Sequence, residues 1–523
     1  AMSNYNTITS LAESPQQEGL IYAGTDDGLL HVTEDGGDTW RRIELADIDG
    51  VPAMGFVNDI KADLFDPNTV YVALDDHKNG DFSPYLIKST DRGESWTSIA
   101  GNLPDRHLVW RLVQDDVNEN LLFAATEFGI FFTVDGGTEW VELEGGAPTI
   151  SFRDITIQRR HDDVVGGSFG RGIFILDDYT PLRSVTPELL EQEAHLFDTR
   201  DAHWYVPRDV TDSQGDNMYT AENPPFGAVF TYYLKEGYQT QEAERQEREQ
   251  ALDEGEDVPF PGWDALEAEQ REQGPVVLVV VKDENGTVVN RVAGPTSAGF
   301  HRVNWDLEYP SKDVVDLGSE EFGAPGDDGF MATPGTYTAT LTKIEEGTMT
   351  TLSDPITFEV VPLREGTLDG APHEEIAAFR EEVEALQQDL STTANTLEQQ
   401  LDKVHAMQTA LARAEREAPQ LVTQLHEART QLLDLREAME GSEAKGEIGE
   451  RSPPTPRSRV FVGYRALRTT YGPTEMHREM IAVGRSELAT IQSQLDDLVE
   501  NVMPELESAL EAAGAPPLEN SGG

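Results

Sequence analysis

The chain has 523 residues, with 39 Lys and Arg against 97 Asp and Glu, and therefore carries a formal net charge of −58. So negative a chain disfavours nucleic acid and anionic membranes as partners, because both are polyanions. The absence of cysteine excludes disulfides, thiolate metal sites and a cysteine nucleophile. No run of about 18 apolar residues is present that could span a membrane, and residues 1–5 show no signal-peptide pattern.

The acidic residues are spread over every segment of the chain, and lysine is scarce, with none between Lys88 and Lys235. This pattern is typical of proteins from salt-accumulating halophiles, where high ionic strength screens the self-repulsion of the folded state. A protein that binds cations or a basic partner is the alternative. We favour the halophilic origin, because a local function would concentrate the charge in one place.

Residues 1–185 contain four β-rich units of about 45 residues, a period typical of propellers and solenoids. Three of the units end in the pattern Ser/Thr-x-Asp-x-Gly-x-x-Trp, at residues 33–40, 89–96 and 133–140. Short β-branched and aromatic runs between Gly, Asp and Asn clusters predict strands, and three or four strands make one propeller blade. The fold class that we predict is therefore multidomain and mainly β, beginning with a partial β-propeller of about four blades.

Residues 186–221 are predicted to be a connector. Residues 222–362 hold several short strand patterns, including a hairpin turn at Asn285-Gly286, and predict an immunoglobulin-like β-sandwich. A Glu- and Gln-rich insertion at residues 239–273 interrupts it, as either a solvated helix or a disordered segment. The acidic loop at residues 313–328 lacks the spacing of an EF-hand.

Residues 373–512 change to helical periodicity, with apolar residues recurring at three, four and seven positions. One helix starts near His373, a second at Pro419 and a third at Pro473, with a Pro/Ser/Gly linker at residues 441–456. We predict a C-terminal α-helical bundle. Its apolar stripes fit an ordinary core better than a partner-binding groove.

Several segments of residues 1–185 resemble a known family. The repeated pattern is similar to the Asp box, or BNR repeat, of sialidase-like and sortilin-like β-propellers. The fourth unit ends in Gly-Arg-Gly-Ile-Phe-Ile-Leu-Asp-Asp (170–178) followed by Pro181-Leu182, and Glu13-Ser14-Pro15 and residues 24–28 precede the first repeat. Together, in this order, they resemble a large family of secreted bacterial BNR-repeat proteins that are often labelled glycosyl hydrolase.

The resemblance implies a β-propeller and a secreted or periplasmic protein. Sialidase-like propellers usually have more blades than the four units found here. Either the chain is the C-terminal portion of a larger protein, which we favour, or self-association or a partner chain supplies the missing propeller half.

The acidic and aromatic residues of the repeats are expected to be structural. In a blade hairpin the Asp side chain can cap the amides of its own turn, Gly supplies the backbone with positive φ, and Trp packs between blades. This interpretation covers Asp35, Trp40, Asp91, Trp96, Asp135 and Trp140.

The candidate ligand site lies where the innermost strands of a propeller converge on its central channel. The polar residues expected there are Asp59, Arg111, Arg153 and Asp154. Arginines from neighbouring blades beside carboxylates could bind an anionic or hydroxylated ligand. The alternative is a network of salt bridges that merely lines the channel.

A second group of candidates lies in the loops after second strands, at the rim of the propeller: Asp26, Asp27, Asp76, Glu127 and Arg171. His77 follows two aspartates, but one histidine among acids is a weak metal signal. No phosphate-binding loop, nucleophile elbow or zinc-protease motif is present. We therefore expect no metal and no cofactor.

Two functions remain open. The first is non-catalytic binding of a glycan or protein ligand, as in sortilin-like propellers. The alternative is a glycoside hydrolase of the sialidase-like or two-propeller glucanase type, with part of its active site outside this chain. Sialidase chemistry requires an arginine triad and a Tyr–Glu pair that we do not find, and abundant acidic residues are no evidence for a catalytic carboxylate pair. Whether the chain is an enzyme thus stays undecided.

Overall fold

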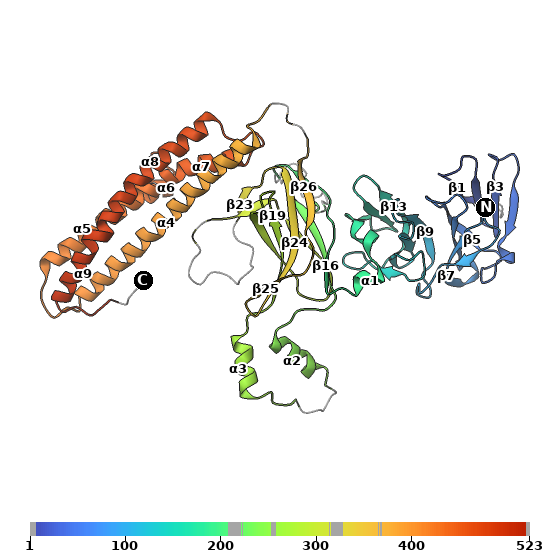
Figure 1. Cartoon of the computed structure of the whole chain (residues 1–523), viewed down its shortest axis with the longest axis horizontal. Coiled ribbons are helices and arrows are strands. Elements are labelled where there is room, and N and C mark those ends of the chain that lie inside the picture. Colours follow the sequence, from blue (N-terminus) through green and yellow to red (C-terminus); the bar gives the residue numbers. More distant parts are fainter. Residues whose placement is uncertain are drawn as a thin grey trace. The chain divides into compact units, whose positions relative to one another are not determined.

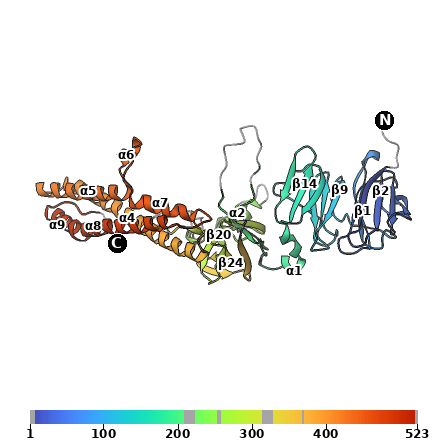
Figure 2. The same ribbon diagram turned by 90° about the horizontal axis from the view of Figure 1, so that it is seen from above.

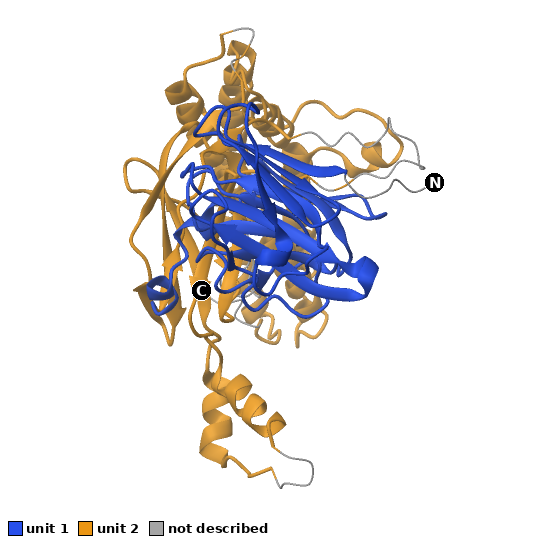
Figure 3. Ribbon diagram, turned by 90° about the vertical axis from the view of Figure 1, so that its right-hand side faces the viewer, with its two compact units in different colours: residues 1–192 blue, residues 193–523 orange. Residues whose placement is uncertain are grey.

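The computed structural model describes residues 7–207, 221, 223–252, 258–312, 314, 328–364, 366 and 369–518. Strands dominate its first half and long helices its C-terminal part (Figure 1). The chain divides into two compact units, residues 1–192 and 193–523 (Figure 3). The acidic loop predicted at residues 313–328 lies almost entirely outside the described residues.

Unit 1 is built from four small antiparallel sheets that follow one another along the chain. The first sheet holds β1 (Ile8–Glu13), β2 (Ile21–Thr25), β3 (Leu29–Thr33) and β4 (Arg41–Glu44). The second holds β5 (Phe56–Ala62), β6 (Val70–Asp76), β7 (Asp81–Ser89) and β8 (Thr97–Ser98). The third holds β9 (Val109–Gln114), β10 (Leu122–Thr126), β11 (Gly129–Thr133) and β12 (Val141–Glu142). The fourth holds β13 (Phe152–Gln158), β14 (Asp163–Ser168) and β15 (Ile173–Leu176).

Successive sheets of unit 1 are joined by their first strands and by apolar layers. Strand β5 lies beside β1 and β9, and β9 also lies beside β13. One buried cluster joins the first and second sheets, another the second and third, and another the third and fourth. Burial of apolar side chains contributes about 1.5–3 kcal/mol for each large residue, so these layers hold the series together.

The repeated pattern forms the turn between the third and fourth strands of the first three sheets. In the second sheet, Asp91 Oδ1 accepts hydrogen bonds from the backbone amides of Glu94 (2.9 Å) and Ser95 (2.8 Å). Asp35 and Asp135 bind the amides of their own turns in the same way. Bonds from the Ser95 hydroxyl and amide lower the pKa of Asp91 to about 2.

The tryptophans of the second and third repeated turns pack against the preceding sheet. The Trp140 indole N–H donates to the Ile99 carbonyl (2.8 Å), and its ring is buried between the second and third sheets. Trp96 packs against the core shared by the first and second sheets. Trp40 differs from the prediction: it is 45% exposed, because no described sheet precedes the first.

Unit 1 ends at Gln192, beyond the predicted boundary at residue 185. The short helix η3 (Thr180–Ser184) is attached to the third sheet, because Arg183 Nη2 lies 2.7 Å from the buried carboxylate of Asp115. Helix α1 (Pro187–Leu190) follows, with the Thr186 hydroxyl accepting the Leu189 amide at its N-terminus.

The strand-rich part of unit 2 has two main sheets, of three and six strands, that share one hydrophobic core. The first sheet has the order β16 (Ala194–Leu196), β18 (Ala228–Leu234), β21 (Gly299–Trp305). The second has the order β17 (Ala202–Trp204), β26 (Ile356–Pro362), β24 (Gly335–Glu345), β19 (Val276–Lys282), β20 (Val288–Gly294), with β25 (Thr348–Thr351) paired to β24. A hairpin of β22 (Glu308–Pro310) and β23 (Asp328–Met331) completes this part.

The predicted connector at residues 186–221 differs from the structure in its first half. Strand β16 pairs with β18, and β17 pairs in parallel with β26, so both belong to the sheets of unit 2. Each is only three residues long, which is too short for a periodic signal in the sequence. Residues 208–220 of the predicted connector lie outside the described residues.

The polar insertion at residues 239–273 contains two helices, α2 (Gln241–Gln250) and α3 (Trp263–Arg271). They contact each other through Arg245, whose Nε lies 2.8 Å from the carboxylate of Glu269. No residue of either helix is buried. Of the two predicted alternatives, the solvated helix therefore fits this segment.

The C-terminal region is helical, as predicted, and its long helices run side by side (Figures 1 and 2). The helices are α4 (His373–Leu411), α5 (Pro419–Glu440), α6 (Glu443–Glu447), α7 (Pro456–Leu467), α8 (Glu475–Asp497), the π-helical turn η4 (Leu498–Val502) and α9 (Met503–Ala512). The sequence did not predict α7. Among the described residues, no helix has a stretch apolar and long enough to cross a membrane.

Candidate functional site

The first strand of every sheet in unit 1 carries a β-bulge at the same position. The strand pairing skips one residue of the first strand in each sheet, and the skipped residues are Thr9, Asn58, Trp110 and Arg153. A bulge bends its strand and turns a side chain out of the regular alternation. The four side chains therefore point toward the junctions between successive sheets.

The first two junctions between sheets use the same pair of hydrogen bonds. The bulge residue bonds a carbonyl of the next sheet: Thr9 Oγ1 to Val57 (2.7 Å) and Asn58 Nδ2 to Val109 (2.9 Å). The residue after the bulge accepts an amide of the next sheet. Ser10 Oγ accepts the Ile60 amide (2.9 Å), and Asp59 Oδ2 accepts the Leu112 amide (3.1 Å). Asp59 thus performs the same joining role as Ser10.

The junction between the third and fourth sheets departs from this arrangement. Its bulge residue, Trp110, donates its indole N–H to Glu127 Oε2 (3.0 Å), and the Ser151 hydroxyl donates to the same oxygen (2.9 Å). The guanidinium of Arg153, the next bulge residue, lies 3.7 Å from the centroid of the Trp110 ring. Its Nη2 is 3.5 Å from Glu127 Oε2. Trp110 and Glu127 therefore hold Arg153 in one orientation.

Arg153 and its neighbour Phe169 are accessible from solvent at this junction. The Arg153 side chain is 44% exposed, whereas Trp110 beneath it is buried. Phe169, which follows β14, is 71% exposed and its ring lies 5.5 Å from the same guanidinium. An oriented cation beside an exposed ring can bind an anionic or hydroxylated group and the apolar surface next to it.

The four predicted channel residues fall into two groups. Arg111 lies between Asp59 (Nη1–Oδ1 3.8 Å) and Asp154 (Nε–Oδ1 3.7 Å), so these three form a row of ion pairs. Lys61 approaches Asp59 from the other side at 3.8 Å. Burial raises the pKa of Asp59, although Lys61, the Leu112 amide and Arg111 all act to lower it. Arg153 lies outside this row and contacts Trp110 and Glu127 instead.

Three of the predicted rim residues accept hydrogen bonds from residues of their own sheet or of the segments beside it. Asp26 Oδ1 accepts the Thr7 amide (2.9 Å), Asp27 accepts the Thr25 hydroxyl, and Asp76 accepts the Asn79 side-chain amide. Arg171 lies exposed in the turn after β14. Glu127 is the rim residue that the structure brings to a channel candidate, because it is paired with Arg153.

His77 lies near Trp110 of the same junction. Its Nδ1 contacts the buried carboxylate of Asp75, and its ring meets the Trp110 ring edge to face with centroids 6.0 Å apart. In the part of the chain that the structure describes, no group of three or more His, Asp or Glu residues is placed to hold a metal ion.

The sequence analysis did not nominate three residues of this junction: Trp110, Ser151 and Phe169. Trp110 could have been noticed as an aromatic residue at a position that carries a small polar residue in the two preceding units. No comparable signal marks Ser151. Phe169 directly precedes the segment at residues 170–178 that resembles the BNR-repeat family, and its position beside that motif is the only signal that the sequence offers for it.

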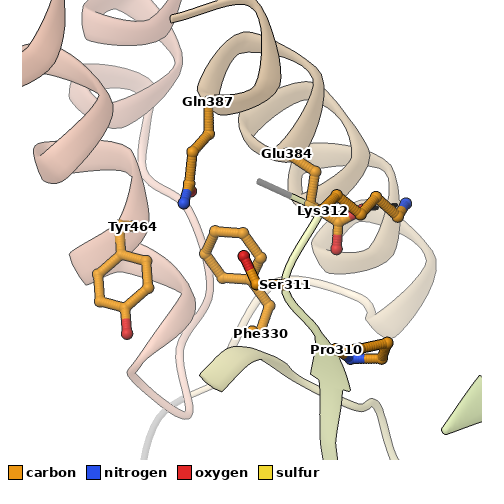
Figure 4. Close-up of a pocket in the computed structure, with 8 residues that line it drawn as sticks. Pro310, Ser311, Lys312, Phe330, Glu384, Gln387 and Tyr464 are labelled. Carbon is orange, nitrogen blue, oxygen red and sulfur yellow. Dashed lines mark hydrogen bonds and ion pairs between the residues drawn. The ribbon is translucent and has the colours of Figure 1, made fainter. Parts of the chain in front are cut away.

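A separate small cleft lies in unit 2, between the β22–β23 hairpin and helices α4 and α7 (Figure 4). Lys312 pairs there with the buried carboxylate of Glu384, and the Phe330 and Tyr464 rings lie 5.2 Å apart. Nearby, the Arg380 guanidinium lies 3.7 Å from the centroid of the Tyr309 ring. These contacts attach the hairpin to the helices, which is a structural role.

No protein-family model matches the chain. A xyloglucanase from Hypocrea jecorina (strain QM6a) is 29% identical over 149 residues, which cover 26% of this chain and 17% of that protein. The chain therefore matches less than a fifth of the length of this curated relative.

The chain is also similar to solved structures of β-propeller proteins. The xyloglucanase of glycoside hydrolase family 74 from Xanthomonas campestris is 12% identical, covers 67% of this chain and 46% of its own, and has a TM-score of 0.28. YCF48 bound to D1 peptide is 20% identical, covers 33% and 52%, and has a TM-score of 0.26. The Cps50 (Swd1) β-propeller domain from Myceliophteria thermophila is 14% identical, covers 35% and 55%, and has a TM-score of 0.26. Identities and scores this low carry no argument about activity.

Proposed function

We propose that unit 1 is part of a BNR-repeat β-propeller in which each small sheet is one blade, followed in unit 2 by an immunoglobulin-like sandwich and a helical bundle. The Asp-capped turns at Asp35, Asp91 and Asp135 and the row of first strands support this assignment. Dispersed acidity supports a halophilic source, and resemblance to secreted BNR-repeat proteins supports a secreted or periplasmic location.

We infer that the chain binds a glycan or protein ligand without catalysis, and that the ligand contacts the junction of the third and fourth sheets. One observation carries this proposal: Arg153 is stacked on Trp110 and paired with Glu127, beside the exposed ring of Phe169. The chain has a net charge of −58, so an exposed and oriented arginine stands out from its acidic surroundings. Such an arginine can bind a carboxylate or sugar hydroxyls.

Departure from the repeated junction strengthens this inference. Small polar bulge residues suffice to join the first three sheets, so holding the sheets together does not require a tryptophan and an arginine. Positions where a chain breaks its own structural rule are the expected places for function. Asp154 adds an accessible carboxylate. It belongs to the row of ion pairs with Arg111 and is 78% exposed.

The second candidate function is a glycoside hydrolase. Two observations favour it: the local similarity to a xyloglucanase, and the raised pKa of Asp59 next to the exposed Asp154. A raised pKa is a property of carboxyls that act as general acids. However, Asp59 is only 5% exposed and bound to the Leu112 amide, so a substrate could not reach it without rearrangement. Binding without catalysis is therefore the better supported function.

The test is a binding screen of the full chain in molar KCl against xyloglucan oligosaccharides, acidic oligosaccharides and peptides, measured by calorimetry. We expect Arg153→Ala to weaken binding tenfold or more, because a hydrogen bond between the ligand and a charged group contributes about 1.5–3 kcal/mol. Arg160→Ala is the matched control, because Arg160 is an exposed arginine in the turn between β13 and β14. Equal losses in both variants would contradict the site.

Turnover separates the two candidate functions. Chromogenic glycosides are incubated with the wild type, Asp154→Asn and Asp59→Asn in the same buffer. We expect no release of chromophore by any of the three. Release by the wild type that is lost in the Asn variants would replace the binding proposal with the glycoside hydrolase.

A further inference from the structure

Residues 451–474 form a positively charged stretch within an acidic chain. They contain five arginines and no aspartate or glutamate, whereas the whole chain has 39 Lys and Arg against 97 Asp and Glu. Helix α7 lies in this stretch and packs against α4, α5 and α8. The negative charge of the chain is dispersed, but this positive charge is concentrated in one place. A local concentration of charge points to a local function.

Two of these arginines have acidic partners on neighbouring helices. Arg457 Nη1 lies 2.6 Å from Glu440 Oε1 at the end of α5. Arg459 donates to both carboxylate oxygens of Glu487 in α8, at 2.8 and 3.0 Å. These pairs attach α7 to the bundle. Arg465 differs, because it is exposed and has no hydrogen bond or ion pair with any of the described residues. Its guanidinium is therefore available to a partner.

Aromatic residues lie beside Arg465 on the exposed face of α7. Tyr464, Arg465 and Arg468 follow Phe461 by three, four and seven positions, so the four residues share one face of the helix. We call them the α7 stripe. The Phe461 and Tyr464 rings are stacked, with an interplanar angle of 14° and centroids 6.4 Å apart. Phe461 is 58% exposed, so the stacked pair can be reached from solvent.

Contacts within unit 2 hold the α7 stripe in place. The Tyr464 ring lies 5.2 Å from the ring of Phe330 in the β22–β23 hairpin (Figure 4). Arg468 donates a hydrogen bond to the Tyr464 hydroxyl, and its Nη2 lies 3.6 Å from Glu308 Oε1. A surface that is already ordered loses little conformational entropy when a partner binds.

The composition of the α7 stripe is typical of an interface rather than of a solvated helix face. Tyr, Phe and Arg are enriched in the cores of protein–protein interfaces, whereas Lys and Glu are depleted there. Tyr and Arg are also among the residues that dominate binding hot spots. Helix α2 of the same unit shows the contrast, since its ten residues are mostly Glu and Gln and none of them is buried.

We propose that the α7 stripe binds a short acidic segment of a partner protein. Carboxylates of that segment pair with Arg465 and Arg468, and an apolar side chain beside them packs on Phe461. Charge complementarity selects this occupant, because the stripe lies in a stretch of five arginines without an acidic residue. A long polyanion such as nucleic acid would also meet the acidic residues of the adjoining helices α4 and α8, which repel it.

The net charge of the chain sets the conditions for this binding. At low ionic strength the charge of −58 repels an acidic partner before it reaches the α7 stripe. Salt at molar concentration reduces the Debye length to about 3 Å and screens that repulsion. Direct contacts with Arg465 are screened less, because the bound segment covers them. Binding is therefore measured in molar KCl.

Selection of short random peptides on the immobilised full chain in molar KCl tests the proposal. We expect the wild type to enrich peptides that combine Asp or Glu with Phe, Leu or Trp. An enriched peptide is then labelled with fluorescein and titrated by fluorescence anisotropy. Arg465→Ala and Phe461→Ser are each expected to weaken its binding about tenfold, the loss typical of a central interface residue. Both side chains are exposed, so both variants are expected to keep the circular dichroism of the wild type.

Two variants elsewhere in the helical region are matched controls. Arg485 is an exposed arginine of α8, and Val422 is a 58% exposed apolar residue of α5, so Arg485→Ala and Val422→Ser are expected to bind the peptide as the wild type does. No enrichment, enrichment of basic peptides, or equal losses in the controls would overturn the proposal. So would tighter binding of a single-stranded oligonucleotide, or a wild-type dimer that Phe461→Ser dissociates, since the face would then serve nucleic acid or a second copy.

Discussion

The guanidinium of Arg153 lies 3.7 Å from the centroid of the Trp110 ring, although the two residues belong to different sheets and are 43 positions apart in the chain numbering. Both are bulge residues of first strands, and each owes its direction to the same irregularity in strand pairing. The Arg153 side chain stays 44% exposed although it stacks on the ring and pairs with Glu127.

The planar shape of Arg153, and not its charge alone, is expected to matter for binding. Lysine keeps the positive charge but cannot stack as a plane on Trp110 or present two parallel donors. We expect Arg153→Lys to lose most of the ligand affinity that Arg153→Ala loses, measured by calorimetry in molar KCl. Affinity close to that of the wild type would show that the ligand needs only a positive charge there.

The buried ion pair of Arg183 and Asp115 is expected to be a main stabilising contact of unit 1. Asp115 is fully buried, and Arg183 lies 2.7 Å from both Asp115 and Asp162. Removing the arginine leaves a buried carboxylate without its cation, which costs about 3–5 kcal/mol. We expect Arg183→Ala to lower the free energy of unfolding by that amount in urea titrations.

Arg159 supplies a control for the same prediction. It is 60% exposed and lies 3.9 Å from Asp116, in the same region of unit 1. A solvent-exposed pair contributes about 0–1 kcal/mol, so Arg159→Ala is expected to unfold almost as the wild type does. Equal effects of the two substitutions would mean that burial of Asp115 is not what makes its partner important.

Local sequence patterns predict the strands and repeated turns of unit 1 because their causes are local. Short apolar runs such as β6 form most of the strands, and Asp91 binds amides within its own turn. The contact of Trp110 with Arg153 has no local cause, since it depends on a bulge in each of two sheets. Sequence analysis therefore nominates Arg153 but not the ring that orients it.

Asp59 has a contact that the sequence does not reveal. Its carboxylate, a predicted candidate for ligand binding, accepts the Leu112 amide, as Ser10 accepts the Ile60 amide. Serine and aspartate look unrelated in the sequence, so the shared role emerges only from the strand register. Helix α7 was missed for another reason: it has just 12 residues, and its N-cap, Thr455, whose hydroxyl accepts the Ser458 amide, lies inside a segment predicted to be a linker.

The aspartates of the repeated turns are expected to make unit 1 sensitive to acid. The Ser95 hydroxyl and amide lower the pKa of Asp91 to about 2, and Thr39 lowers the pKa of Asp35 to about 2. A carboxyl whose pKa is lowered in the folded chain stabilises the fold when the pH is above about 3.9, the pKa of Asp in the unfolded chain. This contribution is lost as the pH falls toward 2. Asp91→Asn is therefore expected to reduce stability at neutral pH and to flatten its decline between about pH 4 and pH 2.

That prediction is checked by following thermal unfolding of the wild type and Asp91→Asn across this pH range at constant KCl. The loss at neutral pH is expected to be about 1 kcal/mol, the scale of the turn hydrogen bonds that weaken. Asp38→Asn is the control, since Asp38 is an exposed acidic residue of the first repeated turn. Parallel curves for wild type and Asp91→Asn would contradict the role given to the carboxylate.

Asp59 is expected to respond to pH in the opposite direction. Burial raises its pKa in the folded chain, against Lys61, the Leu112 amide and Arg111. A carboxyl with a raised pKa binds its proton more tightly in the folded than in the unfolded state, so its ionisation removes stability as the pH rises above about 3.9.

Asp59→Asn has no proton to lose, and its side-chain oxygen can still accept the Leu112 amide. Relative to the wild type, this variant is expected to gain stability on going from acidic to neutral pH, in the same thermal unfolding series. A relative loss over that interval would show that the ion pair with Arg111 outweighs the burial of the carboxylate.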